Sequence, residues 1–203
     1  MKPQIIHREI AYRGYLNVER LRIQLADGAV VSRDIERHGD AAAVLPYDTA
    51  RRCALIVQLF RAPVFTVTQE DCIEEACAGM IEHEADDAAA RREALEELGV
   101  SLHTLERVAR IWSSPGVSTE RQTLYLAPYA SSDRIGTGGG AAGEHEGIKV
   151  VERPLADLAL DVDHGRIVDG KLVILLLALR IRQPGLFLPA GLTYMTQGQL
   201  AAG

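Results

Sequence analysis

Hydrophobic and polar residues alternate along the first part of the chain, which is the pattern of a β-strand with one buried face. The alternation is clearest over residues 15–25, and Asp27-Gly28 follows as a hairpin signal. Residues 5–37 therefore predict short strands joined by turns. Because this piece is more polar than the chain that follows it, we expect a small antiparallel β element over residues 1–40.

After residue 40 the pattern changes, and continuous apolar runs replace the alternation. Such runs are typical of strands that are buried on both faces of a sheet. The strongest run, Cys-Ala-Leu-Ile-Val-Gln-Leu-Phe at residues 53–60, predicts a central strand, and residues 47–52 before it predict a turn. Further strands are predicted at residues 73–78, 105–113, 122–129 and 148–152.

Helical spacing and end signals predict three helices, at residues 86–98, 154–164 and 171–182. Asp86 and Asp87 favour the positive end of the first helix dipole, and Gly99 is a natural C-terminal stop. Pro154 suits the first turn of the second helix, and Pro184 ends the third. Strands and helices in this order predict an α/β domain with a mixed β-sheet between helices.

One domain of ordinary composition accounts for most of the chain. Of the 203 residues, 47% are hydrophobic and 25% are charged, which is enough apolar chain for a core of normal size. We assign residues 41–183 to this domain, with a glycine-rich loop at residues 131–147. Residues 184–203 are treated as a C-terminal tail.

The net charge of −6 argues against general binding to nucleic acid or to an anionic membrane surface. The longest apolar run, residues 172–179, is too short to cross a bilayer, and no apolar signal segment is visible. Cys53, Cys72 and Cys77 have no metal-ligand spacing, so we expect reduced thiols in a cytoplasmic protein.

Three glutamates on the first predicted helix are the most informative residues of the chain. On a helix, Glu93, Glu96 and Glu97 fall within an arc of about 100°. Like charges at this spacing destabilise a helix by about a few tenths of a kcal/mol per pair, and Arg92 offsets this only locally. A hard divalent cation would turn the repulsion into binding. The alternative is an acidic face that is simply solvated.

Residues 79–100 resemble the signature of the Nudix hydrolases. That signature is a glycine, five residues, a glutamate, seven residues, then Arg-Glu-aliphatic-x-Glu-Glu-x-Gly-aliphatic. The second half is complete from Arg92 to Val100. In the first half only four residues separate Gly79 from Glu84, which leaves the role of Glu84 open. The resemblance implies the Nudix α/β/α sandwich.

Segments outside the signature are similar to the ADP-ribose and nucleotide-sugar branch of this family, and most similar to the GDP-mannose pyrophosphatase type. They are residues 75–79, 113–120, 138–148 and 166–171, and the likeness extends over residues 5–182. One departure is Gln58, where the family often has an arginine in Arg-Gln-Tyr/Phe-Arg. A substrate or dimer contact made by that arginine is expected to be lost.

The resemblance implies hydrolysis of a pyrophosphate bond with Mg²⁺ or Mn²⁺ held by carboxylates. The implied metal ligands are the backbone carbonyl of Ala78 and the side chains of Glu93, Glu96, Glu97 and Glu146. The implied catalytic residues are Glu96, Glu144, Glu146 and Arg92. Arg92 is expected to orient the carboxylates, and either Glu144 or Glu146 is expected to serve as the base. A solvated loop is the alternative for these two.

Five further side chains are expected in or near the site. Arg61 and Glu120 are expected to contact the substrate, with a structural role as the alternative for Glu120. Arg121 is a second candidate for a phosphate contact. Trp112 and Phe60 are expected to belong to the core rather than to stack on a base.

The leading hypothesis is a metal-dependent hydrolase of nucleoside diphosphate sugars or ADP-ribose, which releases a nucleoside monophosphate and a sugar phosphate. One alternative is a Nudix-fold nucleotide-binding module without turnover. Another is a Nudix hydrolase of a different nucleoside diphosphate derivative. The resemblance also implies a homodimer in which the N-terminal element contributes to the interface. The choice of base and sugar is left open by the sequence.

Overall fold

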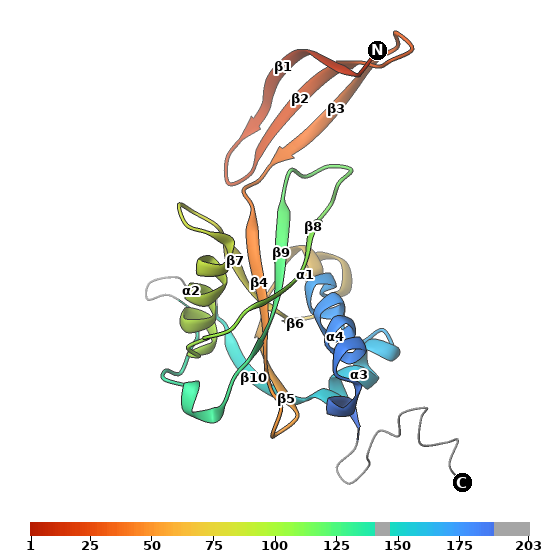
Figure 1. The fold of residues 1–203 in the computed structure, drawn as a ribbon. Helices are drawn as coiled ribbons and strands as arrows, with labels where there is room; N and C mark the ends of the chain where they lie inside the picture. Colours follow the sequence, from red (N-terminus) through yellow and green to blue (C-terminus); the bar gives the residue numbers. More distant parts are fainter. Residues whose placement is uncertain (141–146, 189–203) are drawn as a thin grey trace, which may run out of the picture.

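The computed structural model describes residues 1–140 and 147–188. Within this part, a small N-terminal sheet stands apart from a larger body in which helices cover both faces of a central sheet (Figure 1). The predicted α/β sandwich with a mixed sheet is therefore confirmed.

The N-terminal sheet is antiparallel, with the order β1 (Gln4–Arg13), β2 (Asn17–Gln24) and β3 (Val30–Arg37). Gly28 takes a φ of +89° in the turn between β2 and β3, a conformation that glycine adopts without strain. Every residue of β1 is exposed, and Leu21 is the one buried side chain in the three strands, all of which are described. The sheet is thus stabilised mainly by its ladder and by surface ion pairs.

The loop between β8 and β9 is hydrogen-bonded to the chain that leaves the N-terminal sheet. The backbone of Glu36 at the end of β3 accepts from Thr119 N and donates to Val117 O, at 3.0 and 2.8 Å. His38 N donates to the Thr119 hydroxyl, which donates in turn to His38 O, both at 2.9 Å. These bonds set the direction in which the sheet leaves the body.

The central sheet has seven strands in the order β10-β5-β4-β9-β8, with β6 pairing β5 and β7 pairing β4. The pairing of β4 with β9 is parallel and the others are antiparallel. The strands are β4 (Ala41–Asp48), β5 (Cys53–Leu59), β6 (Ile73–Glu75), β7 (Cys77–Met80), β8 (Glu106–Trp112), β9 (Arg121–Pro128) and β10 (Lys149–Pro154).

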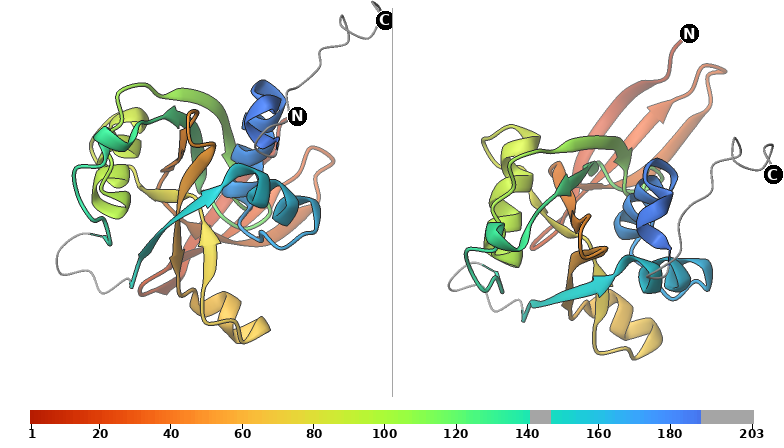
Figure 2. Two further views of the ribbon diagram at one scale, coloured as in Figure 1. Left: turned by 90° about the horizontal axis from the view of Figure 1, so that it is seen from below. Right: turned by 60° about the horizontal axis from the view of Figure 1, so that its bottom comes forward.

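Helix α2 (Asp86–Leu98) covers one face of this sheet, and α3 (Leu155–Asp163) and α4 (Gly170–Arg182) cover the other (Figures 1 and 2). Side chains of β4 alternate between the two layers. Ala42 and Val44 join the core beneath α2, whereas Ala43 and Leu45 join the core beneath α3 and α4. All eight residues of β4 are buried, because helices pack on both sides of the strand. None of the described helices is both long and apolar enough to cross a membrane.

Several predicted strand limits were wrong. The strand expected at residues 73–78 is divided, because the amide of Ala76 donates to Asp169 Oδ2 at 3.0 Å instead of joining the ladder. Tyr47 and Asp48, expected in a turn, extend β4. The predicted helix at residues 86–98 is confirmed with the same limits.

A short helix that the sequence pattern did not predict, α1 (Ala62–Thr68), projects from the body in both views of Figure 2. It buries no residue, so it has no amphipathic pattern to detect. The remaining helical turns are η1 (Ser131–Asp133) and η2 (Pro184–Phe187).

The two aromatic residues expected in the core are on the surface. Phe60 is 53% exposed and pairs with Phe65 of α1, with ring centroids 5.7 Å apart. Trp112 is 54% exposed at the end of the edge strand β8, where the guanidinium of Arg121 lies 6.0 Å from its ring centroid. Both lie where a strand leaves the sheet, so neither faces a packed layer.

Candidate active site

Helix α2 is held close to the sheet by small side chains. Ala89, Ala90 and Ala94 are fully buried against β4 and β5, which lets the helix backbone approach the strands. Gly99 ends the helix at a φ of +66°, and its amide bonds to Leu95 O at 3.1 Å. The close approach brings the acidic side of α2 against the neighbouring strand β7.

Glu97 connects α2 to β7. The residue is only 7% exposed, and its Oε2 accepts from the amide of Ala78 at 3.2 Å. The Ala78 peptide is thereby fixed beside the acidic helix. This places a backbone carbonyl and a carboxylate in the same small region, both of which are hard oxygen donors.

Glu93 lies directly against the backbone of Gly79. A Cβ built on Gly79 would meet Glu93 Oε1 at 1.8 Å, well inside any real contact. A glycine at this position is therefore what allows the Glu93 carboxylate to lie against β7. The first glycine of the Nudix signature has a steric role here that the sequence alone does not show.

Arg92 draws the acidic groups together. Its Nε and Nη2 donate to Glu84 at 3.0 and 2.8 Å, and its Nη1 donates to Glu93 at 2.7 Å and to Glu96 at 3.1 Å. Nη2 also donates to Met80 O at 3.0 Å. Hydrogen bonding to Glu84 first, and then to Glu93 and Glu96, raises the pKa of Arg92 further above its usual value. Glu84 thus reaches Arg92 even though the signature is one residue short.

Arg92, Glu93, Glu96 and Glu97 line one wall of a pocket of about 500 Å³ between α2, β7 and the end of β5. Its lining residues are Leu59, Arg61, Ala78, Gly79, Met80, Glu82, Arg92, Glu93, Glu96 and Glu97. Glu82, in the loop before α2, is an acidic residue that the sequence analysis did not single out. In the sequence, only its position inside the Nudix signature could have indicated that Glu82 lines the site.

The donor set fits a hard divalent cation. Carboxylates and a peptide carbonyl on one pocket wall are the ligands that Mg²⁺ and Mn²⁺ prefer. Within the described residues, no three acidic, histidine or cysteine side chains already surround a common point, since Arg92 and the Ala78 amide hold the carboxylates. Burial first, and then Glu97, raise the pKa of the Cys77 thiol, so this neighbouring group stays protonated.

Of the predicted substrate contacts, Arg61 lines the pocket and the other two do not. Arg61 forms a two-pronged ion pair with Glu75, at 2.6 and 3.1 Å. Glu120 lies beside the N-terminal sheet, where it accepts from Gln122 Nε2 at 3.1 Å. Arg121 donates to both oxygens of Asp40, at 3.0 and 2.7 Å.

Glu144 and Glu146 lie outside the described residues, but the chain that leads to them is placed. The amides of Gly139 and Gly140 donate to the carbonyls of Glu97 and Glu96, at 2.8 and 3.1 Å. Carbonyls at a helix C-terminus have no partner within the helix, and these glycine amides satisfy two of them. The glycine-rich segment therefore begins at the C-terminal end of α2.

Comparison with known proteins gives the family. The model of the NUDIX domain matches residues 37–170, which is most of the body. The chain belongs to the Nudix hydrolase family. The predicted membership is confirmed, and this family generally depends on divalent metal ions.

Proteins of similar length match this chain over most of their sequences. The GDP-mannose pyrophosphatase of Cronobacter sakazakii is 32% identical over 187 residues, which are 90% of this chain and 97% of that protein. The GDP-mannose pyrophosphatase of Pectobacterium atrosepticum is 35% identical over 153 residues, 74% of this chain and 78% of that protein. A crystal structure of an ADP compounds hydrolase matches with a TM-score of 0.72 at 19% identity, over 91% of this chain and 96% of that one, and shows the shared fold.

Proposed function

We propose that the protein hydrolyses the pyrophosphate bond of a nucleoside diphosphate sugar, with GDP-mannose as the first candidate and ADP-ribose as the second. The observation that carries the proposal is the pocket wall formed by Glu93, Glu96, Glu97 and Ala78, whose amide donates to Glu97, with Arg61 at the same pocket. The names of the curated relatives support the choice of a nucleotide sugar. The products are a nucleoside monophosphate and a sugar phosphate.

The charges of the pocket decide what it can accept. A diphosphate carries two negative charges, and the lining contains four glutamates against two arginines. When bound, Mg²⁺ or Mn²⁺ neutralises phosphate charge and acidifies a coordinated water. We assign Ala78 O and the side chains of Glu93, Glu96 and Glu97 to hold it. Arg92 orients Glu93 and Glu96 through its hydrogen bonds to them, and Arg61 attracts the diphosphate.

The proton acceptor for the attacking water is assigned to the glycine-rich loop, at Glu144 or Glu146. Support comes from the bonds of Gly139 and Gly140 to the end of α2, which start this loop beside the acidic wall. Glu146 from this loop is also the last of the proposed metal ligands. We also propose a cytoplasmic location, since all three cysteines carry free thiols.

A nucleotide-sugar panel tests the activity. GDP-mannose, ADP-ribose and UDP-glucose are each incubated with the protein and Mg²⁺, and phosphomonoester release is measured with alkaline phosphatase. We expect turnover of at least one of these, and none in the presence of EDTA. Tight binding of one substrate with no turnover of any would favour a binding module and contradict the proposal.

Glu97→Gln tests the metal wall directly. The amide oxygen can still accept from Ala78 N, so the fold is expected to persist while a charged ligand is lost. Removing a group that positions a catalytic ion is expected to lower kcat by about 100-fold or more. Glu70→Gln, at an exposed position outside this pocket, is the matched control and should retain full activity. Full activity in Glu97→Gln would remove this metal assignment.

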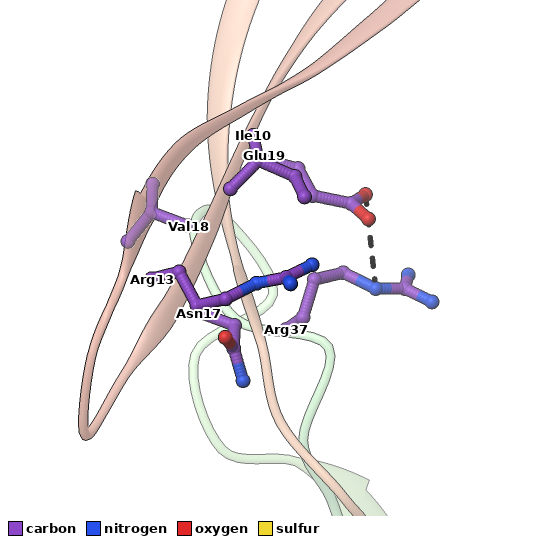
Figure 3. A pocket seen from close by; sticks show the side chains of 6 residues that line it. All are labelled: Ile10, Arg13, Asn17, Val18, Glu19 and Arg37. Atoms are coloured by element: carbon purple, nitrogen blue, oxygen red, sulfur yellow. Dashed lines mark ion pairs between the residues drawn. The ribbon is translucent and has the colours of Figure 1, made fainter.

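We further propose a homodimer formed through the N-terminal sheet. Ile5, Ile6, Ile10 and Tyr12 of β1 are each about half exposed, and a three-stranded sheet without a covered face is marginal on its own. A hollow of about 350 Å³ lies at the body end of this sheet. Among its lining residues, Ile10 lies near the ion pair between Glu19 and Arg37, whose charged atoms are 3.8 Å apart (Figure 3). A second copy of the chain would bury this mixture of apolar and charged groups.

A further inference from the structure

Four charged side chains of alternating sign extend from the start of α4 to the pocket: Asp169, Lys171, Glu75 and Arg61. Lys171 Nζ donates to Asp169 Oδ1 at 2.8 Å and to Glu75 Oε2 at 3.2 Å. On its other side, Glu75 accepts from Arg61 Nε at 2.6 Å and from Nη2 at 3.1 Å. Of these four residues, only Arg61 lines the pocket.

Burial makes this arrangement rigid. Glu75 is 4% exposed, and the side chain of Lys171 is 15% exposed. A buried carboxylate is costly unless cations and hydrogen bonds surround it, so Glu75 depends on both of its partners. Burial opposes ionisation of Glu75, but Arg61 and Lys171 outweigh burial and lower its pKa.

The far end of the series is anchored to the backbone. Asp169 caps α4, with its Oδ2 accepting from Leu172 N at 3.1 Å. The same oxygen accepts from Ala76 N at 3.0 Å, next in sequence to Glu75. Lys171 therefore contacts an acid whose position is fixed by both α4 and the break between β6 and β7.

We propose that Lys171 is a positioning residue for substrate binding, which acts through Glu75 to fix the Arg61 guanidinium at the pocket that Glu93 and Glu96 also line. The inference rests on the proposed function, since it assigns the diphosphate as the anion that Arg61 meets. An arginine whose fork is already fixed loses less side-chain freedom when it binds a phosphate. Lys171 thus contributes to affinity without touching the substrate.

Lys171→Met tests this, because it removes the ammonium and keeps an apolar stem of similar length. With GDP-mannose and saturating Mg²⁺, we expect KM to rise about tenfold while kcat changes less than about twofold, the signature of lost binding rather than lost chemistry. Lys149→Met is the matched control. Lys149 is exposed on β10 and lies outside the pocket. The KM of the Lys149→Met variant should therefore equal that of the wild type.

A double-mutant cycle with Arg61→Ala separates positioning from general stability. If Lys171 acts through Arg61, adding Lys171→Met to Arg61→Ala should change KM by less than about twofold. An unchanged KM in Lys171→Met alone overturns the proposal, and so does a tenfold rise in both backgrounds. If circular dichroism shows that Lys171→Met does not fold, Glu75→Gln takes its place in the cycle with the same expected outcomes.

Calorimetric binding of a methylene-bridged GDP-mannose analogue tests the positioning role of Lys171 independently of the proposed hydrolase activity. The Kd should follow the same pattern as KM across the variants. A wild-type protein that binds the analogue but turns over no substrate contradicts the proposed function, and the Kd values still decide the role of Lys171. A wild-type protein that turns over substrate, with Kd unaffected by Lys171→Met, overturns the positioning role alone.

Discussion

At the scale of single residues, the site depends on the missing side chain of Gly79 as much as on the position of Arg92. Gly79 has no Cβ, and this absence is what leaves room for the Glu93 carboxylate. Arg92 then joins Glu93 to Glu84 and Glu96, so one cation organises three acids. Each of these contacts lies between residues near in sequence that fold onto the same wall.

Gly79→Ala is expected to disable the site while the protein stays folded. The new methyl group would meet the far end of a flexible side chain, so Glu93 would rotate away at small cost in stability. We expect kcat to fall by about tenfold or more, because the proposed ligand leaves its place. Gly116→Ala, with nothing within 4 Å of its Cβ, should leave kcat unchanged. Equal kinetics for the two variants would contradict this steric role.

At the scale of elements, the C-terminal end of α2 and the glycine-rich segment are fitted backbone to backbone. A Cβ on Gly138 would lie 2.2 Å from the carbonyl oxygen of Glu97, and Gly138 has a φ of +67°. Unlike a flexible side chain, this carbonyl belongs to a helix and cannot move alone. The contact therefore fixes the helix and the segment together.

Gly138→Ala is expected to destabilise the protein more than Gly165→Ala does. Both glycines have nearly the same φ, +67° and +68°, but a Cβ on Gly165 meets nothing within 4 Å. Gly165→Ala should cost about 1 kcal/mol for the left-handed backbone, and Gly138→Ala should cost that plus the clash. Urea unfolding measures the difference. Equal free energies of unfolding for the two variants would show that the glycine-rich segment can move away from α2 at no cost.

The ion series between α4 and β6 predicts how stability changes with pH. The pKa of Glu75 is lowered on folding, so ionised Glu75 contributes to the free energy of unfolding. This contribution is complete above pH 4.5, the ordinary pKa of a glutamate, and is lost as the pH falls through the lower pKa of the folded state. Burial opposes the charged form of Lys171, but Asp169 and Glu75 outweigh burial and raise its pKa above 10.5. Its contribution is complete below pH 10.5 and is lost as the pH rises further.

Thermal unfolding of Glu75→Gln across the pH range checks this. The Tm of the variant should lie below that of the wild type at neutral pH, and the two curves should converge as the medium is acidified below pH 4.5. A constant Tm difference down to strongly acidic pH would mean that Glu75 does not stabilise the fold as a charged group.

At the scale of the whole molecule, the exposed face of the N-terminal sheet is the proposed dimer contact. Ile10→Glu, in the middle of exposed β1, is expected to convert a dimer to a monomer, because it places a charge in the proposed apolar contact. Light scattering at micromolar concentration measures the mass. Val67→Glu, on the exposed helix α1, is the control and should remain dimeric. A wild-type protein of monomer mass, 22.1 kDa, would contradict the dimer itself.

Local signals were sufficient for the elements whose ends are defined by their own residues. The limits of α2 followed from its acidic first turn and from Gly99, and its three glutamates follow from helical spacing. The apolar run at residues 53–60 gave β5 because a strand covered on both faces has no polar side. In each case the signal is a pattern of side chains within one continuous segment.

Contacts between distant segments decided the rest. The position of α4 decided the break at Ala76 and the pairing of Glu75 with both Arg61 and Lys171. The sheet edges decided the surface positions of Phe60 and Trp112. The sequence by itself determined the family, the acidic helix and the kind of ion it suits, since these are properties of a continuous stretch. Only the tertiary structure decided that Arg61 and Lys171 meet at Glu75, because that depends on packing between segments far apart in sequence.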